Sequence, residues 1–275
     1  MARTRLIVNA DDFGISPAVT DGILEAHSAG TVTSTSMMVH CPGWAHASGL
    51  ARTAPTLGIG LHFNILSGAP LVPAASLSGT HTGRFLPLTA LVARALTGRL
   101  DGAEVEAECE AQLQAIERIG VRVTHIDSHR HTHALPAVRA AVARVASRRG
   151  LPLRRPVESH RLVPGGLRSH AHRAIVAWSW RAASFGAPRT RAPDHFIGIS
   201  MQGGHGFHAL ISRVLSRLPS GSVELMVHPG HADAALSGMD GYTWQREREL
   251  AALLSAGVRS RMSADDVALA HFGQL

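Results

Sequence analysis

Short apolar runs alternate along the chain with longer stretches in which apolar residues recur at helical spacing. An apolar run of about four to eight residues that ends in Gly, Pro, Asn or Asp is typical of a buried strand. Such runs predict strands at 5–9, 33–39, 58–65, 123–127, 153–157, 195–199, 223–227 and 258–261.

Helices are predicted between these strands, and two of them have clear start signals. Ser16 and Pro17 supply an N-cap and a first-turn proline for a helix that stops at Gly30. Asp101 and Glu104 form a capping-box pair at the start of a second helix. The remaining pattern places helices at 101–119, 136–149, 172–184, 207–217 and 244–255, and a long loop rich in Gly, Pro, Ser and Thr at 66–89.

This alternation of about eight strand–helix units, with no break in composition, predicts an α/β fold and one domain over residues 1–275. The length suits a single (β/α) barrel, which typically takes about 250 residues. In such a barrel the C-terminal ends of the parallel strands open onto the same face. Polar residues that follow different strands are therefore expected to converge there.

The positive charge of the chain suggests nucleic acid as a partner, but the distribution of that charge and the few aromatic residues argue against it. The net charge is +7, and every one of the 27 basic residues is arginine. These arginines are spread along the chain, and the densest group, Arg148, Arg149, Arg154 and Arg155, is interpreted as solvated surface. Aromatic residues make up only 4% of the chain, which leaves few platforms for stacked bases. We therefore expect no nucleic-acid partner.

Other features of the composition exclude further classes. The two cysteines, Cys41 and Cys109, are too few for a disulfide framework or a structural zinc ribbon. No apolar stretch approaches the roughly 18 residues of a membrane span. The apolar run near the N-terminus is too short for a signal peptide, so we expect a cytoplasmic protein. Any metal would be held by histidine and carboxylate, and histidine is abundant, with 18 residues.

Polar residues of chemical interest gather in four segments, each just after a predicted strand. They are Asn9-Ala10-Asp11-Asp12-Phe13-Gly14, Gly60-Leu61-His62-Phe63, the run His125 to His133, and Glu224 to Gly230.

Each segment also has an ordinary structural interpretation. Asp11 and Asp12 repel each other at a strand end unless a cation offsets their charge, although such a pair can also cap a helix or a turn. His62 alone is more often a satisfied core histidine than a ligand. The His125–His133 run holds more imidazoles than a core can easily satisfy, but a surface histidine patch would look similar. His228 precedes Pro-Gly, which by itself indicates a turn.

Taken together, these segments resemble the YdjC/ChbG-like family of carbohydrate deacetylases, in the right order over nearly the whole chain. The resemblance also includes Thr31-Val32-Thr33-Ser34-Thr35-Ser36 and Gly68 with Pro70. It implies a distorted TIM-like barrel related to polysaccharide deacetylases. It further implies that the residues matching Asp12, His62 and His129 hold the metal, and that Asp11 is the catalytic base.

Two departures from the family pattern bear on the substrate pocket. The segment 64–67 lacks a threonine that the family often has, and Arg130 stands where Gln or His is common. Neither removes an expected ligand.

The expected chemistry is hydrolysis of an N-acetyl group on a sugar, such as a chitooligosaccharide. Asp11 would take a proton from water, and His228 would give one to the leaving amine. One divalent ion is expected: the His₂-carboxylate set favours Zn²⁺, Mn²⁺ or Fe²⁺, whereas the family includes Mg²⁺, so Mg²⁺ and Zn²⁺ both stay open. Residues expected to contact substrate or to orient the ligands are His125, Asp127, His131, His133 and Glu224.

The alternatives keep part of this site. One is a deacetylase of a hopanoid-linked amino sugar, and another is a barrel that binds metal or sugar without catalysis. A glycosidase ranks low because its two carboxylates must flank the sugar bond, whereas Asp11 and Asp12 are adjacent. A homodimer is left open as the assembly state.

Overall fold

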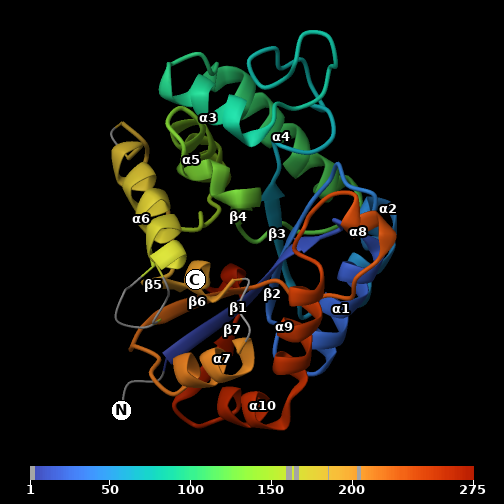
Figure 1. Ribbon diagram of the computed structural model, residues 1–275, viewed down its shortest axis with the longest axis vertical. Helices are drawn as coiled ribbons and strands as arrows, with labels where there is room; N and C mark the ends of the chain where they lie inside the picture. Colours follow the sequence, from blue (N-terminus) through green and yellow to red (C-terminus); the bar gives the residue numbers. More distant parts are fainter. Residues whose placement is uncertain (1–3, 159–162, 164–166, 185, 203–205) are drawn as a thin grey trace.

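The computed structural model describes residues 4–158, 163, 167–184, 186–202 and 206–275. Helices surround a central sheet on the outside, with the polypeptide passing repeatedly from the sheet to the outer layer (Figure 1). No helix within the described residues is long and apolar enough to cross a membrane.

The central sheet is seven-stranded, and its paired strands are all parallel. Its strand order is β4-β3-β2-β1-β6-β5, and β7 pairs with the N-terminal half of β1. The strands are β1 (Thr4–Phe13), β2 (Ser34–Met37), β3 (Gly58–Phe63), β4 (Ile126–Ser128), β5 (His195–Ile197), β6 (Ser222–Val227) and β7 (Val267–Ala270).

The curled sheet closes on itself through an irregular segment, residues 153–158. At one end of this segment Leu153 forms a parallel bridge with Ile126 of β4. At the other end Glu158 forms a parallel bridge with Phe196 of β5. Because β4 and β5 are the two ends of the strand path, the segment joins them, and the expected distorted barrel is confirmed.

Six outer helices lie close to the predicted ranges, whereas the helices at 44–50, 88–96, 234–237 and 256–262 were not predicted. Ser16 caps α1 by accepting a hydrogen bond from the Val19 backbone, and Asp101 caps α4 through the Ala103 backbone. Gly150 ends α5 in the left-handed region, at φ 64°. The helices are α1 (Pro17–Ser28), α2 (Trp44–Leu50), α3 (Leu88–Leu96), α4 (Gly102–Arg118), α5 (Val138–Arg149), α6 (Leu167–Ala182), α7 (Phe207–Leu215), α8 (Ala234–Ser237), α9 (Trp244–Leu254) and α10 (Ala256–Met262). Short 3₁₀ segments lie at Ala51–Thr53, His129–Ala134, Ile199–Met201 and Phe272–Gln274, and the second is interrupted by a kink at Arg130 and His131.

Two strand predictions were wrong in detail. The residues 258–261 belong to α10, because Ser255 caps that helix and its side chain accepts the Val258 backbone N–H. The last strand is instead β7, a few residues further along. The predicted strand 153–157 is an irregular bridge, since Pro156 has no N–H to donate to a regular ladder.

Candidate metal and catalytic site

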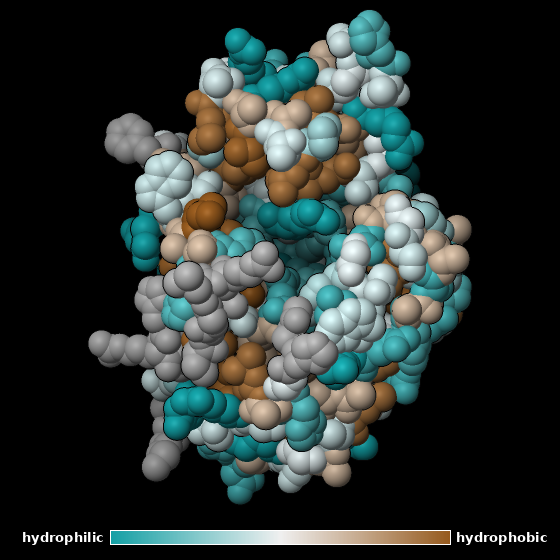
Figure 2. Space-filling view, in the orientation of Figure 1, coloured by the Kyte–Doolittle hydropathy of each residue, from teal (hydrophilic) through white to brown (hydrophobic). Residues whose placement is uncertain are grey.

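The C-terminal ends of β1, β3, β4 and β6 surround one pocket of about 290 Å³. The molecular face in Figure 2 is hollowed near its centre, and hydrophilic residues line the hollow. Seven of the residues singled out from the sequence line the pocket: Asp11, Asp12, His62, His129, Arg130, His131 and His228.

The backbone of β1 explains how two adjacent carboxylates reach the same pocket. Successive side chains of a regular strand point to opposite faces. Asp12 has a φ of 73°, and the β1–β2 register shifts between Ala10 and Phe13. A positive φ costs an aspartate of order 1 kcal/mol or more, so the surrounding contacts must hold it in place. This local irregularity turns Asp12 to the side of Asp11.

Asp12, His62 and His129 bring three donor atoms together. Asp12 Oδ1 lies 3.0 Å from His129 Nδ1 and 3.2 Å from His62 Nε2. Metal–ligand bonds of about 2.0–2.2 Å place neighbouring ligand atoms about 3.0–3.5 Å apart, so the residues present fit one divalent ion. The other carboxylate oxygen, Asp12 Oδ2, accepts a hydrogen bond from Arg246 Nη2 at 2.6 Å, which leaves Oδ1 to face the imidazoles.

His62 is oriented from behind by a second carboxylate. Its Nδ1 lies 2.7 Å from Asp127 Oδ1 and 3.0 Å from Ser36 Oγ. Burial alone would lower the pKa of His62, but the Asp127 and Asp12 carboxylates outweigh it and raise the pKa to about 10. A carboxylate behind a ligating imidazole fixes its ring orientation and increases its basicity as a ligand.

Asp11 is held by a bidentate ion pair with Arg154. Arg154 Nη1 donates to Asp11 Oδ2 at 2.6 Å, and Nη2 donates to Oδ1 at 2.7 Å. Asn9 Nδ2 donates to the same Oδ1 at 2.8 Å. Burial would raise the pKa of Asp11, yet the Arg154 guanidinium holds it well below its usual range. Asp11, His62 and Asp127 also form a compact group of potential ligands, but Arg154 already supplies the positive charge there.

Arg154 joins three buried carboxylates at the centre of the barrel. Besides Asp11 it contacts Asp127 Oδ2 at 2.8 Å and donates from Nε to Glu224 Oε1 at 2.6 Å. Arg154 and Glu224 are both fully buried. Burial, with the nearby Asp11 and Asp127 charges, raises the pKa of Glu224 to about 8 even though Arg154 opposes the shift. Glu224 thus lies behind the pocket and does not line it.

His228 lies at the end of β6 and lines the pocket opposite the donor triad. Its Nε2 is 4.0 Å from Asp11 Oδ2 and 3.3 Å from the side chain of Gln202. Its ring is tilted against Tyr242, with the centroids 5.5 Å apart. Met226, two residues earlier on β6, also lines the pocket, whereas Glu224 does not.

The three remaining histidines of the cluster lie in different places. His131 lines the pocket, and its φ of 54° belongs to the left-handed turn that follows β4. His133 is buried behind the pocket, where its two nitrogens contact Ser128 Oγ and the Arg154 carbonyl. His125 is buried further away, stacked on Phe272 with the ring centroids 3.9 Å apart. Neither His125 nor His133 lines the pocket.

Sequence reasoning missed the two arginines that organise the site. Arg154 was interpreted as solvated surface, which was wrong, because the side chain is fully buried. Arg246 was not singled out, although it is also fully buried and binds Asp12. The available signal was the excess of carboxylates at strand ends, since buried charges need partners. The pocket residues outside the four segments are Leu88, His172, Gln202, Asp240 and Tyr242.

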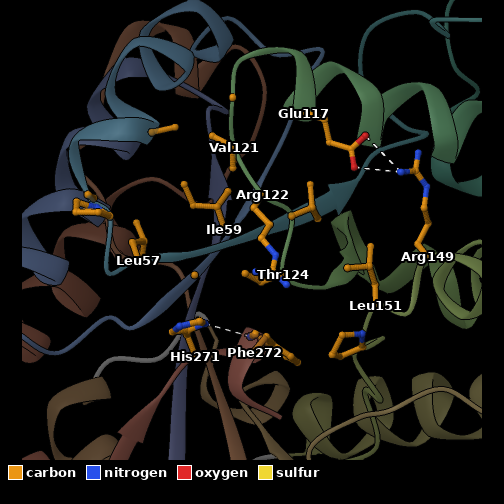
Figure 3. Close-up of a pocket in the computed structure, with 18 of the residues that line it drawn as sticks. Leu57, Ile59, Glu117, Val121, Arg122, Thr124, Arg149, Leu151, His271 and Phe272 are labelled. Carbon is orange, nitrogen blue, oxygen red and sulfur yellow. Dashed lines mark hydrogen bonds and ion pairs between the residues drawn. The ribbon is translucent and has the colours of Figure 1, made fainter.

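A larger cavity of about 700 Å³ lies at the opposite ends of the strands. Figure 3 shows residues around it from the starts of β3 and β4, including Ile59, Arg122 and Thr124, with His271 and Phe272 from the chain end. None of the residues predicted from the sequence to act in catalysis or metal binding lines it. Cavity size alone therefore does not identify the chemically equipped site.

The pocket thus combines donors suited to one divalent ion with a separate carboxylate and an imidazole that could transfer protons. Asp11 and Asp12 are each held by a different arginine, Arg154 and Arg246. The two aspartates can therefore have different roles although they are adjacent in the sequence.

The chain matches the family model described as YdjC-like protein over residues 5–264. It is 36% identical to a carbohydrate deacetylase of Geobacillus stearothermophilus, over 96% of this chain and 94% of that protein. It is 34% identical to a human carbohydrate deacetylase, over 99% of this chain and 91% of that protein. A solved structure from Enterococcus faecalis V583, whose given name refers to cellobiose-phosphate cleavage, matches with a TM-score of 0.78 at 27% identity, covering 100% of this chain and 99% of that one. The resemblance seen in the sequence is confirmed, and the chain belongs to the YdjC-like family.

Proposed function

We propose that this protein is a metal-dependent deacetylase that hydrolyses the amide bond of an N-acetylated sugar, such as a chitooligosaccharide. The observation that carries the proposal is the convergence of Asp12, His62 and His129 in a pocket that also holds Asp11 and His228. The relatives named carbohydrate deacetylase support the same reaction class.

Asp12, His62 and His129 would hold the ion. A divalent ion bound there would act as a Lewis acid on the acetyl carbonyl and increase the acidity of water. Two imidazoles and one carboxylate favour Zn²⁺ over Mg²⁺, which prefers oxygen ligands, although Mg²⁺ stays an alternative. Asp127 would keep the His62 ring aimed at the ion through its contact with Nδ1.

Asp11 and His228 would move the protons. Asp11 is ionised over the neutral pH range because Arg154 lowers its pKa, so it is available to accept a proton from the attacking water. His228 would donate a proton to the sugar amine as the amide bond breaks, since an amine leaves only when protonated. Asp11 Oδ2 and His228 Nε2 are 4.0 Å apart, so both lie within reach of one amide group bound in the pocket.

The pocket itself favours a small substrate group. Its volume of about 290 Å³ is at the lower end of the roughly 300–1,000 Å³ range of ligand pockets, which suits one sugar ring better than several. Gln202, Asp240 and Tyr242, which also line it, carry hydrogen-bonding groups of the kind that recognise sugar hydroxyls.

The test combines metal analysis with acetate release. The protein would be stripped with a chelator, reloaded separately with Zn²⁺ and Mg²⁺, and incubated with N-acetylglucosamine, di-N-acetylchitobiose and an N-acetylglucosaminide with a long apolar aglycone. We expect acetate release from at least one sugar, only after reloading, and loss of bound metal in His62→Ala and His129→Ala. Preference for the apolar aglycone would favour the hopanoid-type substrate, and metal binding without acetate release would refute the enzymatic proposal.

A further inference from the structure

We propose that Glu249 is a positioning residue that sets the orientation of His228 through its backbone and through Tyr242. The kinetic part of this inference rests on the proposed function. Glu249 lies on α9 outside the pocket lining, and its side chain is almost fully buried, with 1% exposed. Among the described residues, its hydrogen bonds to pocket residues are those to His228 and Tyr242.

The two carboxylate oxygens of Glu249 accept one hydrogen bond each. Oε2 accepts the backbone N–H of His228 at 2.6 Å, and Oε1 accepts the hydroxyl of Tyr242 at 2.5 Å. His228 comes directly after β6 ends at Val227, so its N–H continues no strand ladder. Glu249 thus fixes the point at which the chain leaves the strand and presents the imidazole.

The hydrogen bond between Glu249 and Tyr242 also influences the orientation of the His228 ring. Tyr242 packs against the His228 imidazole, and Glu249 holds the Tyr242 hydroxyl. Among the described residues His228 Nδ1 is buried and has no hydrogen-bond partner. A hydrogen bond at Nδ1 is the usual device that orients a catalytic histidine. Here the hydrogen bond from the His228 backbone to Glu249 and the ring contact with Tyr242 orient the imidazole instead.

The chemistry of position 249 argues against a purely packing role. Burying a carboxylate is costly unless it is well paired, and an apolar residue of similar volume is often as stable or more so. Glu249 is surrounded by its two neutral donors, and no ion pair within 4 Å involves it among the described residues. The carboxylate of Glu249 is therefore buried at a place where its two oxygens bind two residues of the pocket, which packing alone does not require.

The neighbouring turn of α9 gives the helix a second link to the site. Arg246, three residues before Glu249, holds Asp12 Oδ2 at 2.6 Å. The same helix therefore fixes both the donor side and the His228 side of the pocket. A shift of Glu249 would misplace His228 without releasing Asp12, so the two effects can be separated by experiment.

The variants separate positioning from charge. Glu249→Leu removes both hydrogen bonds, whereas Glu249→Gln keeps them, since the amide oxygen can accept the His228 N–H and the amide nitrogen can donate to the Tyr242 oxygen. Tyr242→Phe removes only the hydroxyl and keeps the ring. Glu247→Leu, an exposed position on the same helix, is the matched control.

Three properties of the metal-loaded enzyme would be measured: the steady-state kinetics, the bound metal and the nitrogen-15 resonances of the His228 imidazole. The His228→Asn variant would assign these resonances. For Glu249→Leu we expect kcat to fall by about 10–100-fold, because small misplacements of a reacting group have effects of that size. We expect KM to change by less than about threefold and the metal content to stay unchanged, whereas Glu249→Gln should recover most of kcat. The His228 resonances should shift in Glu249→Leu and Tyr242→Phe but not in the control.

Three results would overturn the inference: unchanged His228 resonances in both Glu249→Leu and Tyr242→Phe, a Gln variant as impaired as the Leu variant, or loss of metal in Glu249→Leu. If Glu249→Leu does not fold, Tyr242→Phe and Glu249→Gln carry the same comparison. The resonances are read without any substrate. If the parent protein releases no acetate, the proposed function is refuted. The His228 resonances would still decide whether Glu249 positions His228.

Discussion

The guanidinium of Arg154 binds both carboxylate oxygens of Asp11, at 2.6 and 2.7 Å, although 143 residues separate them in the chain. A bidentate pair of this kind fixes the plane of the carboxylate as well as its charge. Asp11 lines the pocket and Arg154 does not, so the guanidinium holds the Asp11 carboxylate at the pocket wall from behind. Asp12 has a comparable partner in Arg246, which contacts only one oxygen.

Replacing Arg154 by methionine should strongly destabilise the protein. The change leaves Asp11, Asp127 and Glu224 buried without their shared cation, and breaking a buried pair typically costs about 3–5 kcal/mol. Urea unfolding would measure the difference. Arg155→Met is the control, because Arg155 is exposed and hydrogen-bonds to the backbone carbonyls of Pro193 and Asp194. This change should alter stability by less than about 1 kcal/mol. Equal effects of the two changes would contradict the central role of Arg154.

Replacing Arg246 by methionine should weaken metal binding. Without the hydrogen bond at Oδ2, the Asp12 carboxylate can rotate away from His62 and His129. Loss of a group that orients a metal ligand typically costs about 10–100-fold in affinity. Competition with a coloured chelator would give the affinity for Zn²⁺ and Mg²⁺. Arg248→Met, which removes an arginine over the half-exposed Trp244 ring, should leave the affinity unchanged.

The grouping of the site could be predicted because its residues sit at strand ends. Buried strands have a strong apolar signature, and a parallel barrel gathers their C-terminal ends at one face. Asp12, His62 and His129 therefore come together in the structure as the sequence pattern suggested. The weak points were short elements without that signature, such as β7, where only Val267 is buried among four residues.

The arginine partners could not be predicted because their contacts are non-local. Arg246 lies 234 residues from Asp12, and its surroundings on α9 are charged and read as an exposed helix. Arg154 is close in sequence to Arg148, Arg149 and Arg155, so the sequence does not indicate which of these arginines is buried. Sequence spacing indicates that a carboxylate at a strand end needs a cation. It does not indicate whether a metal or a distant guanidinium provides it.

Asp11→Asn should separate proton transfer from metal binding. The amide has nearly the same shape but cannot accept the proton, so the rate of acetate release should fall by about 10²–10⁴-fold. Bound metal should stay at the parent level, because Asp12, His62 and His129 are unchanged. Kinetics and metal analysis on the same preparation would test both expectations. Full activity in the variant would eliminate Asp11 as the base.

His125 should make the protein sensitive to acid. Its complete burial lowers its pKa from 6.5 to about 3, outweighing the opposing Asp127 carboxylate. In the unfolded chain the imidazole regains its ordinary pKa, so the unfolded state binds a proton first as the pH falls below about 6.5. Stability is therefore complete above that pH and is lost as the pH decreases towards the folded-state value.

The predicted loss can be isolated by comparing two pH values. One histidine contributes about 1.4 kcal/mol per pH unit within this window, so His125 should account for about 2 kcal/mol between pH 7.5 and pH 5.0. His125→Gln should lower stability at pH 7.5, because stacking on Phe272 is lost, but should show a correspondingly smaller further loss at pH 5.0. Urea unfolding at both pH values gives the two differences. His81→Gln, at an exposed position, should keep the full pH dependence of the parent protein, and an equally steep dependence in His125→Gln would show that His125 is not the group that senses acid.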